Sequence, residues 1–173
     1  LKQGEFKAIF PEDGKTNGSV HRVYVKECQL ETDMEILIPI TYVNPVTERL
    51  SLYKDLNNII DQKGLNEYIT MLIDRFGPLP EQVKALVHSI NLKWKAAEVG
   101  FEKLVLKQGK MIGYFINDPN SNYFESGSFS NIIKFANNHT STCRLKEEKN
   151  KLSLTVMGIS TVDKANELIQ TIL

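Results

Sequence analysis

The sequence predicts an α+β fold, with an N-terminal cluster of three helices followed by a ββαββα unit that forms a small, mainly antiparallel sheet. Between residue 44 and Gly100, apolar residues recur at every third or fourth position, which is the period of an amphipathic helix. After Gly100 the period changes to two, and short apolar runs flank turn residues, as is typical of β-hairpins. The chain of 173 residues, with 24% charged and 42% hydrophobic residues, has the composition of a folded protein.

The N-terminal part lacks these patterns, so we expect residues 1–43 to be an extended lead-in and residues 44–173 to form the main domain. A connector rich in Pro, Gly and Asn occupies residues 11–19. Residues 20–30 and 35–43 are strand-like, although Pro39 cannot donate a hydrogen bond to a strand ladder. Because no initiator Met is present, we expect the sequence to be a piece of a longer chain.

Capping and breaking residues mark the first two helices. Asn44 is a candidate cap and Pro45 suits the first helical position, where its missing N–H costs nothing. We expect this helix to end near Gly64. The second helix ends at Gly77, which we expect to be a left-handed stop, and Pro78 prevents its continuation.

A third helix opens at Pro80 and closes at Gly100. Because the connecting loops are short, the three helices are expected to pack as a compact antiparallel cluster. The residues predicted to face inward in this cluster are Val46, Leu50, Tyr53, Leu56, Ile60, Leu65, Ile69, Leu72, Phe76, Val83, Leu86, Val87, Ile90, Trp94 and Ala97.

The C-terminal half is predicted to contain two hairpins, with turns at residues 108–109 and 147–150. A short helix between them is expected to be capped by Ser126 or Ser128, and a last helix begins near residue 160. A four-stranded sheet with helices on one face is the natural assembly of these elements.

Composition excludes several classes of function. The formal net charge of zero argues against a dedicated nucleic-acid binder, which usually carries a strongly basic domain. Cys28 and Cys143 lie far apart without a CxxC pattern, which favours free thiols in a reducing compartment over a disulfide or a metal site. No apolar run approaches the roughly 18 residues that span a membrane. We therefore expect a cytoplasmic protein with no membrane partner.

No motif for catalysis or cofactor binding is recognisable. The Gly-Lys-Thr run at residues 14–16 lacks the second glycine of a phosphate loop, since Ile9 occupies that position. The three histidines have no partner at ligand or triad spacing, so we expect no metal, no cofactor and no enzyme activity in this chain. They are His21, His88 and His139.

Carboxylates on the second and third helices are the candidate partner contacts, namely Glu67, Asp74 and Glu81. Glu67 and Asp74 are two helical turns apart, so one helix face can carry both. Three interpretations stay open: a solvated face, which the pattern favours, an acidic docking surface, and a catalytic pair, which would need a cleft and a raised pKa.

Other candidates also have two interpretations. Arg75 either complements the dipole at a helix C-terminus or contacts a partner. Trp94 lies on an apolar stripe, as a core residue or an interface residue. Lysines flank both hairpins, where a role in solubility is favoured over a nucleic-acid patch because no aromatic residues interleave them. They are Lys103, Lys107, Lys110, Lys146, Lys149 and Lys151.

The segment from Glu48 to Val87 resembles the C-terminal domain of the bacterial transcription-repair-coupling factors (Mfd). The family pattern is an Arg-Leu-x-x-Tyr-Lys helix, then Leu-x-Asp-Arg-Phe-Gly-x-x-Pro, then a long helix. The similarity extends over about residues 35–173 and is specific over residues 49–81. The matching residues, which we interpret as structural, are Arg49, Leu50, Tyr53, Lys54, Leu72, Asp74, Arg75, Phe76, Gly77, Pro78 and Pro80.

This resemblance implies a role that the residues alone do not reveal. Such factors are ATP-driven DNA translocases that push stalled RNA polymerase off damaged DNA and recruit the excision-repair protein UvrA. ATP and Mg bind in their motor domains, whose motifs are missing from this sequence. Their C-terminal domain is regulatory: it docks on the UvrA-binding module of the same protein and restrains the motor. The resemblance thus implies a monomeric interaction domain, and a DNA-binding accessory module is the alternative.

Overall fold

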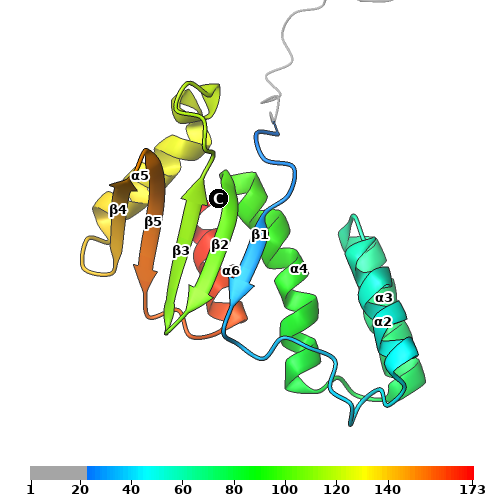
Figure 1. Ribbon diagram of the computed structural model, residues 1–173. Helices are drawn as coiled ribbons and strands as arrows, with labels where there is room; N and C mark the ends of the chain where they lie inside the picture. Colours follow the sequence, from blue (N-terminus) through cyan, green and yellow to red (C-terminus); the bar gives the residue numbers. More distant parts are fainter. Residues whose placement is uncertain (1–22) are drawn as a thin grey trace, which may run out of the picture.

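The computed structural model describes residues 23–173, which form helices and one mixed sheet (Figure 1). The predicted α+β class and the order of helices before the ββαββα unit are confirmed. The connector at residues 11–19, the Gly-Lys-Thr run and His21 lie outside the described residues. The elements are β1 (Gln29–Thr32), α2 (Val46–Asn57), α3 (Gln62–Phe76), α4 (Glu81–Val99), β2 (Phe101–Lys107), β3 (Lys110–Phe115), the 3₁₀ helix η1 (Asn122–Glu125), α5 (Gly127–Asn138), β4 (Cys143–Glu148), β5 (Lys151–Met157) and α6 (Val162–Ile172).

The sheet has five strands in the order β1-β2-β3-β5-β4, so the expectation of four strands was wrong. The added strand, β1, comes from the lead-in and pairs in parallel with β2, while the other neighbours are antiparallel. The Thr32 hydroxyl donates to the Leu106 carbonyl at 2.8 Å and fixes the end of β1. The boundary at residue 43 stays a prediction, but β1 is part of the sheet.

The second strand-like stretch of the lead-in, residues 35–43, forms no strand in the described part of the chain. It packs instead against the helices, where Ile38 and Val43 are buried. Two hydrogen bonds hold it there. The Ile38 N–H donates to the Tyr53 hydroxyl at 2.7 Å, and the Tyr42 hydroxyl donates to the Gly77 carbonyl at 2.8 Å.

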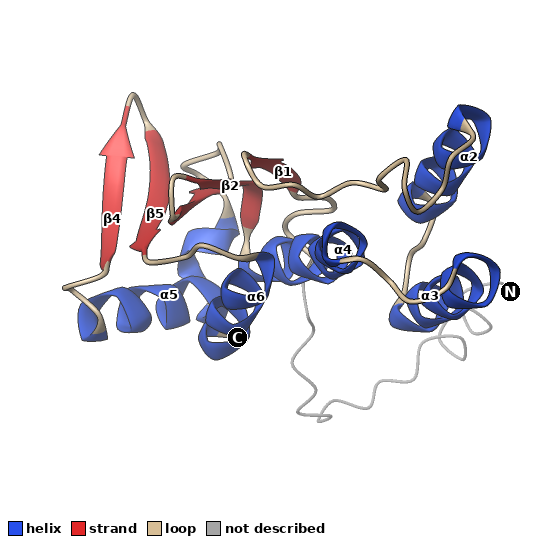
Figure 2. Cartoon of the chain, turned by 90° about the horizontal axis from the view of Figure 1, so that it is seen from below, coloured by secondary structure: helices blue, strands red, loops and turns tan. Residues whose placement is uncertain are grey.

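Three helices cover one face of the sheet, and Figure 2 shows α4, α5 and α6 lying side by side beneath the strands. The alternation along β3 explains this layer: Met111 and Phe115 are buried against the helices, whereas Ile112 and Tyr114 point to the other face and are only half-buried. The largest fully buried side chains of this sheet core include Tyr123, Phe101, Leu104, Leu106, Met111, Ile132, Leu154 and Ile169.

A second hydrophobic core lies between α2, α3 and the first half of α4. The compact cluster of three helices was therefore only partly right, because α4 is shared. Its first half buries Val83 and Val87 in the helical core, and its second half buries Leu92, Ala96 and Val99 in the sheet core. Nineteen residues give α4 enough length to serve both.

The expected inward face of α2 was only partly right: Leu56 is buried and Tyr53 is half-buried against the helical core, as predicted, but the other three residues are exposed. Leu52 and Leu56 are buried, whereas Val46, Leu50 and Ile60 are 59%, 63% and 87% exposed. Both sets have helical spacing, so the periodicity alone could not choose between them. The position of α3 decides, because the Tyr68 hydroxyl of α3 donates to the Leu52 carbonyl at 2.9 Å and α3 covers that side of α2.

The predicted ends of α2 were also displaced. Pro45 occupies the cap position without a side-chain bond, so Asn44 does not cap the helix. The helix ends at Asn57, and Gly64 lies in the first turn of α3. The cap that was overlooked is Asp61, whose carboxylate accepts from the Gly64 N–H at 2.8 Å.

Two glycines terminate helices as predicted, but in different conformations. Gly100 ends α4 with φ 112° and ψ 17°, the left-handed cap. Gly77 ends α3 with φ 91° and ψ −169°, a region that is essentially restricted to glycine but is not left-handed helical. Its N–H donates to the Ile73 carbonyl at 2.9 Å, so the helix still closes there.

The two hairpins of the C-terminal half and the Ser126 cap are confirmed. The turn residues Gln108 and Gly109 have φ values of 53° and 71°, as two-residue hairpin turns require. The second turn is tighter than expected, with residues 149–150 between β4 and β5. Ser126 caps α5 and Thr161 caps α6, each accepting from the N–H three residues on.

Candidate functional site

A shallow hollow of about 620 Å³ runs along the exposed side of α3. It contains Glu67 and Asp74, which the sequence placed on one helix face, and both are exposed. One basic residue, Lys63, lies in the same hollow, so the hollow is weakly acidic. We call this the α3 surface, and its residues are Lys63, Asn66, Glu67, Thr70, Met71 and Asp74.

The third candidate carboxylate is not part of the α3 surface. Glu81 lies in the first turn of α4, where an acidic side chain complements the helix dipole. Its carboxylate pairs with Lys84 at 3.1 Å, one turn further along the helix. The structure therefore brings together two of the three candidates and gives Glu81 a local role.

Exposed apolar side chains lie at one end of the α2–α3 pair and were missed from the sequence. An ion pair between Glu48 and Arg75 joins the first turn of α2 to the last turn of α3. Val46 and Leu50 of α2 and Ile73 of α3 are at this end, and all three are among the exposed large hydrophobic residues. This apolar end adjoins Asp74 along the chain. The sequence shows that these residues occupy apolar helical positions. Only the packing of α2 against α3 shows that they stay exposed.

Most residues of the family motif hold the helical core together. Arg49 donates to the carbonyls of Val43 and Asn44, at 2.9 and 2.5 Å. Leu72 is fully buried, and its carbonyl lies 3.1 Å from the Tyr42 hydroxyl, whose single proton it shares with the Gly77 carbonyl. The motif residues at the surface are Leu50, Lys54, Asp74, Arg75 and Pro78.

Phe76 is half-buried at the junction of the helices and contacts the ring of Tyr42, with ring centroids 5.7 Å apart. The Arg75 guanidinium lies 4.7 Å from the centroid of the Phe76 ring. Through this contact and its ion pair with Glu48, Arg75 connects the end of α3 to the start of α2. Trp94 is half-buried against the helical core and lines a groove with Ile60 and Ile90.

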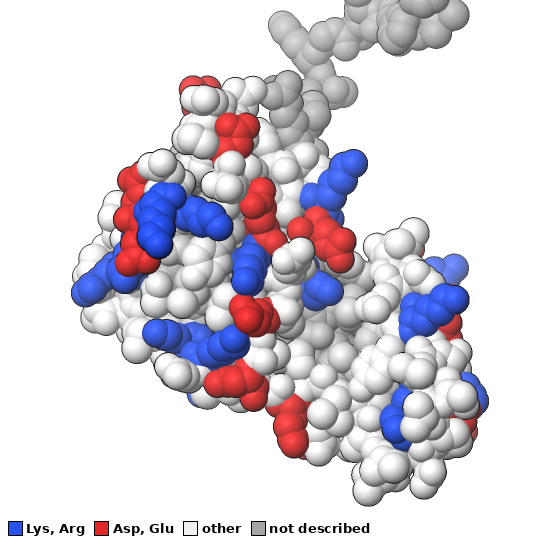
Figure 3. Space-filling view, in the orientation of Figure 1, with Lys and Arg blue, Asp and Glu red and all other residues white. Residues whose placement is uncertain are grey.

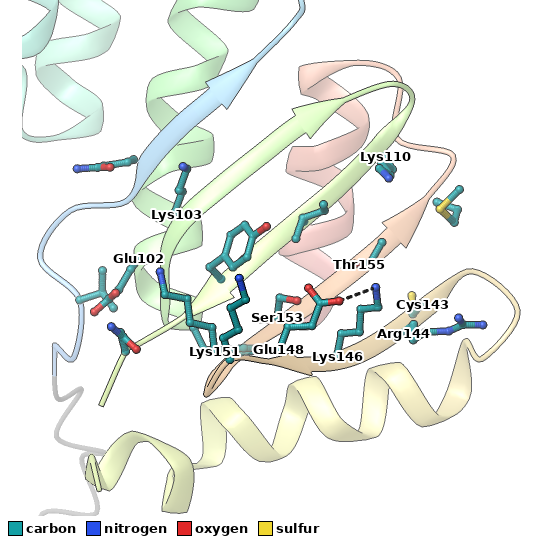
Figure 4. Close-up of a pocket in the computed structure, with 18 of the residues that line it drawn as sticks. Glu102, Lys103, Lys110, Cys143, Arg144, Lys146, Glu148, Lys151, Ser153 and Thr155 are labelled. Carbon is teal, nitrogen blue, oxygen red and sulfur yellow. Dashed lines mark hydrogen bonds and ion pairs between the residues drawn. The ribbon is translucent and has the colours of Figure 1, made fainter. Parts of the chain in front are cut away.

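The open face of the sheet forms a hollow with a volume of about 1230 Å³. Figure 4 shows polar side chains standing on this face, away from the helices. Its lining carries seven lysines and arginines against three glutamates. We call it the sheet face, and its central residues are Lys103, Lys110, Ile112, Tyr114, Arg144, Lys146, Lys151, Ser153, Thr155 and Met157.

Neither a metal-binding group nor a membrane-spanning helix is found among residues 23–173. Among residues 23–173, no group of three His, Cys, Asp or Glu side chains is placed to hold a metal ion. No helix in that part of the chain has the length and apolar character to cross a membrane. Cys28 and Cys143 are both buried, free thiols, and burial raises the pKa of the Cys28 thiol to about 12.

Comparison with known proteins identifies the family. The family model of the TRCF domain matches residues 32–126, which is more than half of the chain. The chain belongs to the TRCF domain family. The resemblance deduced from residues 48–87 is thereby confirmed.

Two curated relatives of this TRCF domain are much longer proteins. It is 25% identical over 138 residues to the transcription-repair-coupling factor of Rickettsia bellii, covering 79% of this chain and 12% of that protein. It is 33% identical over 79 residues to the factor of Escherichia coli, covering 46% of this chain and 7% of that protein. The chain thus spans about an eighth or less of the length of these relatives.

A solved structure shares the fold. The crystal structure of a C-terminal domain of transcription-repair coupling factor superposes with a TM-score of 0.68 at 18% identity, covering 87% of this chain and 94% of that one. At this identity the likeness concerns the fold, including the sheet with its covering helices.

Proposed function

We propose that this TRCF domain is a non-catalytic regulatory module of a transcription-repair-coupling factor. In this proposal the α3 surface docks on the UvrA-binding module of the same protein, masks it, and restrains the ATP-dependent DNA translocase that removes stalled RNA polymerase. The observation that carries the proposal is the exposed pair Glu67 and Asp74 in one hollow. Neither carboxylate pairs with a cation among the described residues, so both are available to a basic partner.

The neighbouring apolar end supports docking further. Interfaces combine an apolar centre with a polar rim, and Leu50 and Ile73 supply exposed apolar area at the end of the α2–α3 pair, where Ile73 directly precedes Asp74 in the chain. Inter-domain contacts are modest in size and polar, as a releasable contact requires. Docking regulates the factor only if the domain binds the closed state better than the open one.

Charge reversal in the full-length factor tests this proposal. Glu67→Lys with Asp74→Lys should raise the affinity of the resting factor for UvrA about tenfold or more, because the released module is exposed. The matched control is Glu147→Lys with Glu167→Lys, which makes the same change of charge at exposed positions of β4 and α6. Unchanged UvrA binding by the α3 variant would refute docking through this surface.

Salt dependence gives a second test. A contact between exposed charges weakens as ionic strength rises, because the Debye length falls from about 10 Å at 0.1 M to about 3 Å at 1 M. Capture of this TRCF domain by the isolated UvrA-binding module should therefore be lost at high salt. Capture that persists at 1 M salt would place the contact on an apolar surface instead.

A further inference from the structure

We propose that the sheet face binds single-stranded nucleic acid, independently of the docking proposed for the α3 surface. The first observation is the distribution of charge. The chain is neutral overall, yet the lining of the sheet face carries four more basic than acidic residues. Figure 3 looks onto this face and shows Lys and Arg side chains gathered over the strands, with acidic side chains between them. Such a face is complementary to a polyanion.

The second observation is an aromatic ring among the cations. Tyr114 pairs across the strands with Lys103 on one side and Ser153 on the other, and Ser153 pairs with Lys146. Because paired residues share one face of a sheet, these four side chains form one row. Three strand spacings separate the two lysines, about 14 Å. The prediction that no aromatic residue interleaves the lysines was therefore wrong.

The centre of the face is apolar as well as aromatic. Ile112 lies beside Tyr114 on β3, and Met157, at the end of β5, is 54% exposed. Unpaired bases present flat apolar surfaces that stack on aromatic rings, whereas a duplex shields them. An acidic peptide would pair with the lysines but would leave the Tyr114 ring without a stacking partner. The combination of ring and cations thus favours a single strand.

Several cations of this face are not engaged within the protein. Glu31 pairs with Lys103 and Lys107, at 3.2 and 3.0 Å. Glu148 pairs with Lys146 at 3.3 Å, the ion pair drawn in Figure 4. In the described part of the chain, Arg144 and Lys151 make no ion pair. These two side chains are therefore free to contact phosphates.

The experiment is a fluorescence-anisotropy titration of a labelled mixed-sequence DNA oligomer of about 15 nucleotides with the 173-residue chain. Arg144→Glu with Lys151→Glu should weaken binding about tenfold or more and lower the slope of log affinity against log salt by about 1.4, since each phosphate contact contributes about 0.7. Lys54→Glu with Lys134→Glu, at exposed positions of α2 and α5, should change binding less than about twofold.

Variants of Tyr114 distinguish binding by base stacking from binding by charge alone. Tyr114→Ala should weaken binding about tenfold, and Tyr114→Phe should retain it, because stacking needs the ring and not the hydroxyl. Far-UV circular dichroism of each variant establishes that it is folded. Equal affinity for duplex DNA or for polyglutamate, or unchanged binding by folded Tyr114→Ala, would overturn the proposal. So would an affinity of the Lys54 and Lys134 control as weak as that of the Arg144 and Lys151 variant.

Discussion

The helical region and the sheet region of this TRCF domain differ in both core and surface. The helical core is mainly aliphatic, and the surface above it carries the acidic hollow of α3. The sheet core contains a cluster of rings centred on Tyr123, and the open face of its sheet is basic. The net charge of zero for the whole chain therefore conceals two surfaces of opposite sign. The net charge of the chain therefore does not predict which ligands either surface attracts.

The two regions nevertheless share α4, which runs through both cores. Because one continuous helix contributes to both cores, loss of packing in either region exposes apolar side chains of α4. We therefore expect the domain to unfold as one unit.

The largest effect is expected from Tyr123→Ala in the sheet core. Tyr123 is fully buried, and its hydroxyl donates to the Val99 carbonyl at the end of α4 at 2.6 Å. Deleting such a side chain should lower the free energy of unfolding by about 4 kcal/mol. Urea unfolding measures this loss, and Tyr123→Phe, which keeps the ring, should lose only about 1 kcal/mol.

The same experiment tests the unity of the domain. Trp94 is the only tryptophan in the chain and packs against the helical core, so its fluorescence reports on that region. The transition followed by Trp94 fluorescence should shift together with that followed by far-UV circular dichroism. A Tyr123→Ala protein in which the fluorescence transition stays at its original urea concentration would show that the two regions unfold separately.

A smaller loss is expected from Gly77→Val at the corner between α3 and α4. No atom lies within 4 Å of the position that a Cβ would take, so the cost is conformational and not steric. The φ of 91° with ψ of −169° is restricted to glycine, and a valine there should cost about 2 kcal/mol. Thermal melting by circular dichroism checks this. A variant as stable as the original protein would mean that the corner relaxes freely.

The smallest effect concerns pH and the Cys28 thiol. Burial raises the pKa of this thiol from 9.0 to about 12, and Glu27 adds to the shift while Lys93 opposes it. The folded chain therefore keeps the proton that the unfolded chain releases between about pH 9 and pH 12. This contribution to stability is complete below pH 9 and falls as pH rises through that window.

Comparison with Cys28→Ala isolates this contribution from other groups that titrate at high pH. Urea midpoints at about pH 8 and about pH 10.5 should fall more for the original protein than for the variant. An equal fall in both proteins would assign the pH dependence to other residues.

Local signals predicted much of the fold. Gly100, the Gln108-Gly109 turn and the Ser126 cap act over one or two turns of chain, and the structure has each of them. What was missed depends on distant partners. β1 pairs with residues more than 70 positions away, and the exposure of Leu50 depends on where α3 lies.

The candidate sites also divide into features that local sequence predicts and features that depend on the fold. Helical spacing was enough to place Glu67 and Asp74 on one face, whereas Glu81 had to be excluded by its position on another helix. Alternation along β3 brings Lys110 and Tyr114 to one face, so part of the sheet face was readable from the sequence. Its other residues come from β4 and β5, whose order in the sheet is a property of the fold.

The most direct test of the separation between the two surfaces is the affinity of the 173-residue chain for the isolated UvrA-binding module. Glu67→Lys with Asp74→Lys should weaken this affinity about tenfold or more, while Arg144→Glu with Lys151→Glu should leave it unchanged. The opposite pattern, with binding lost only in the sheet-face variant, would contradict the assignment of docking to the α3 surface.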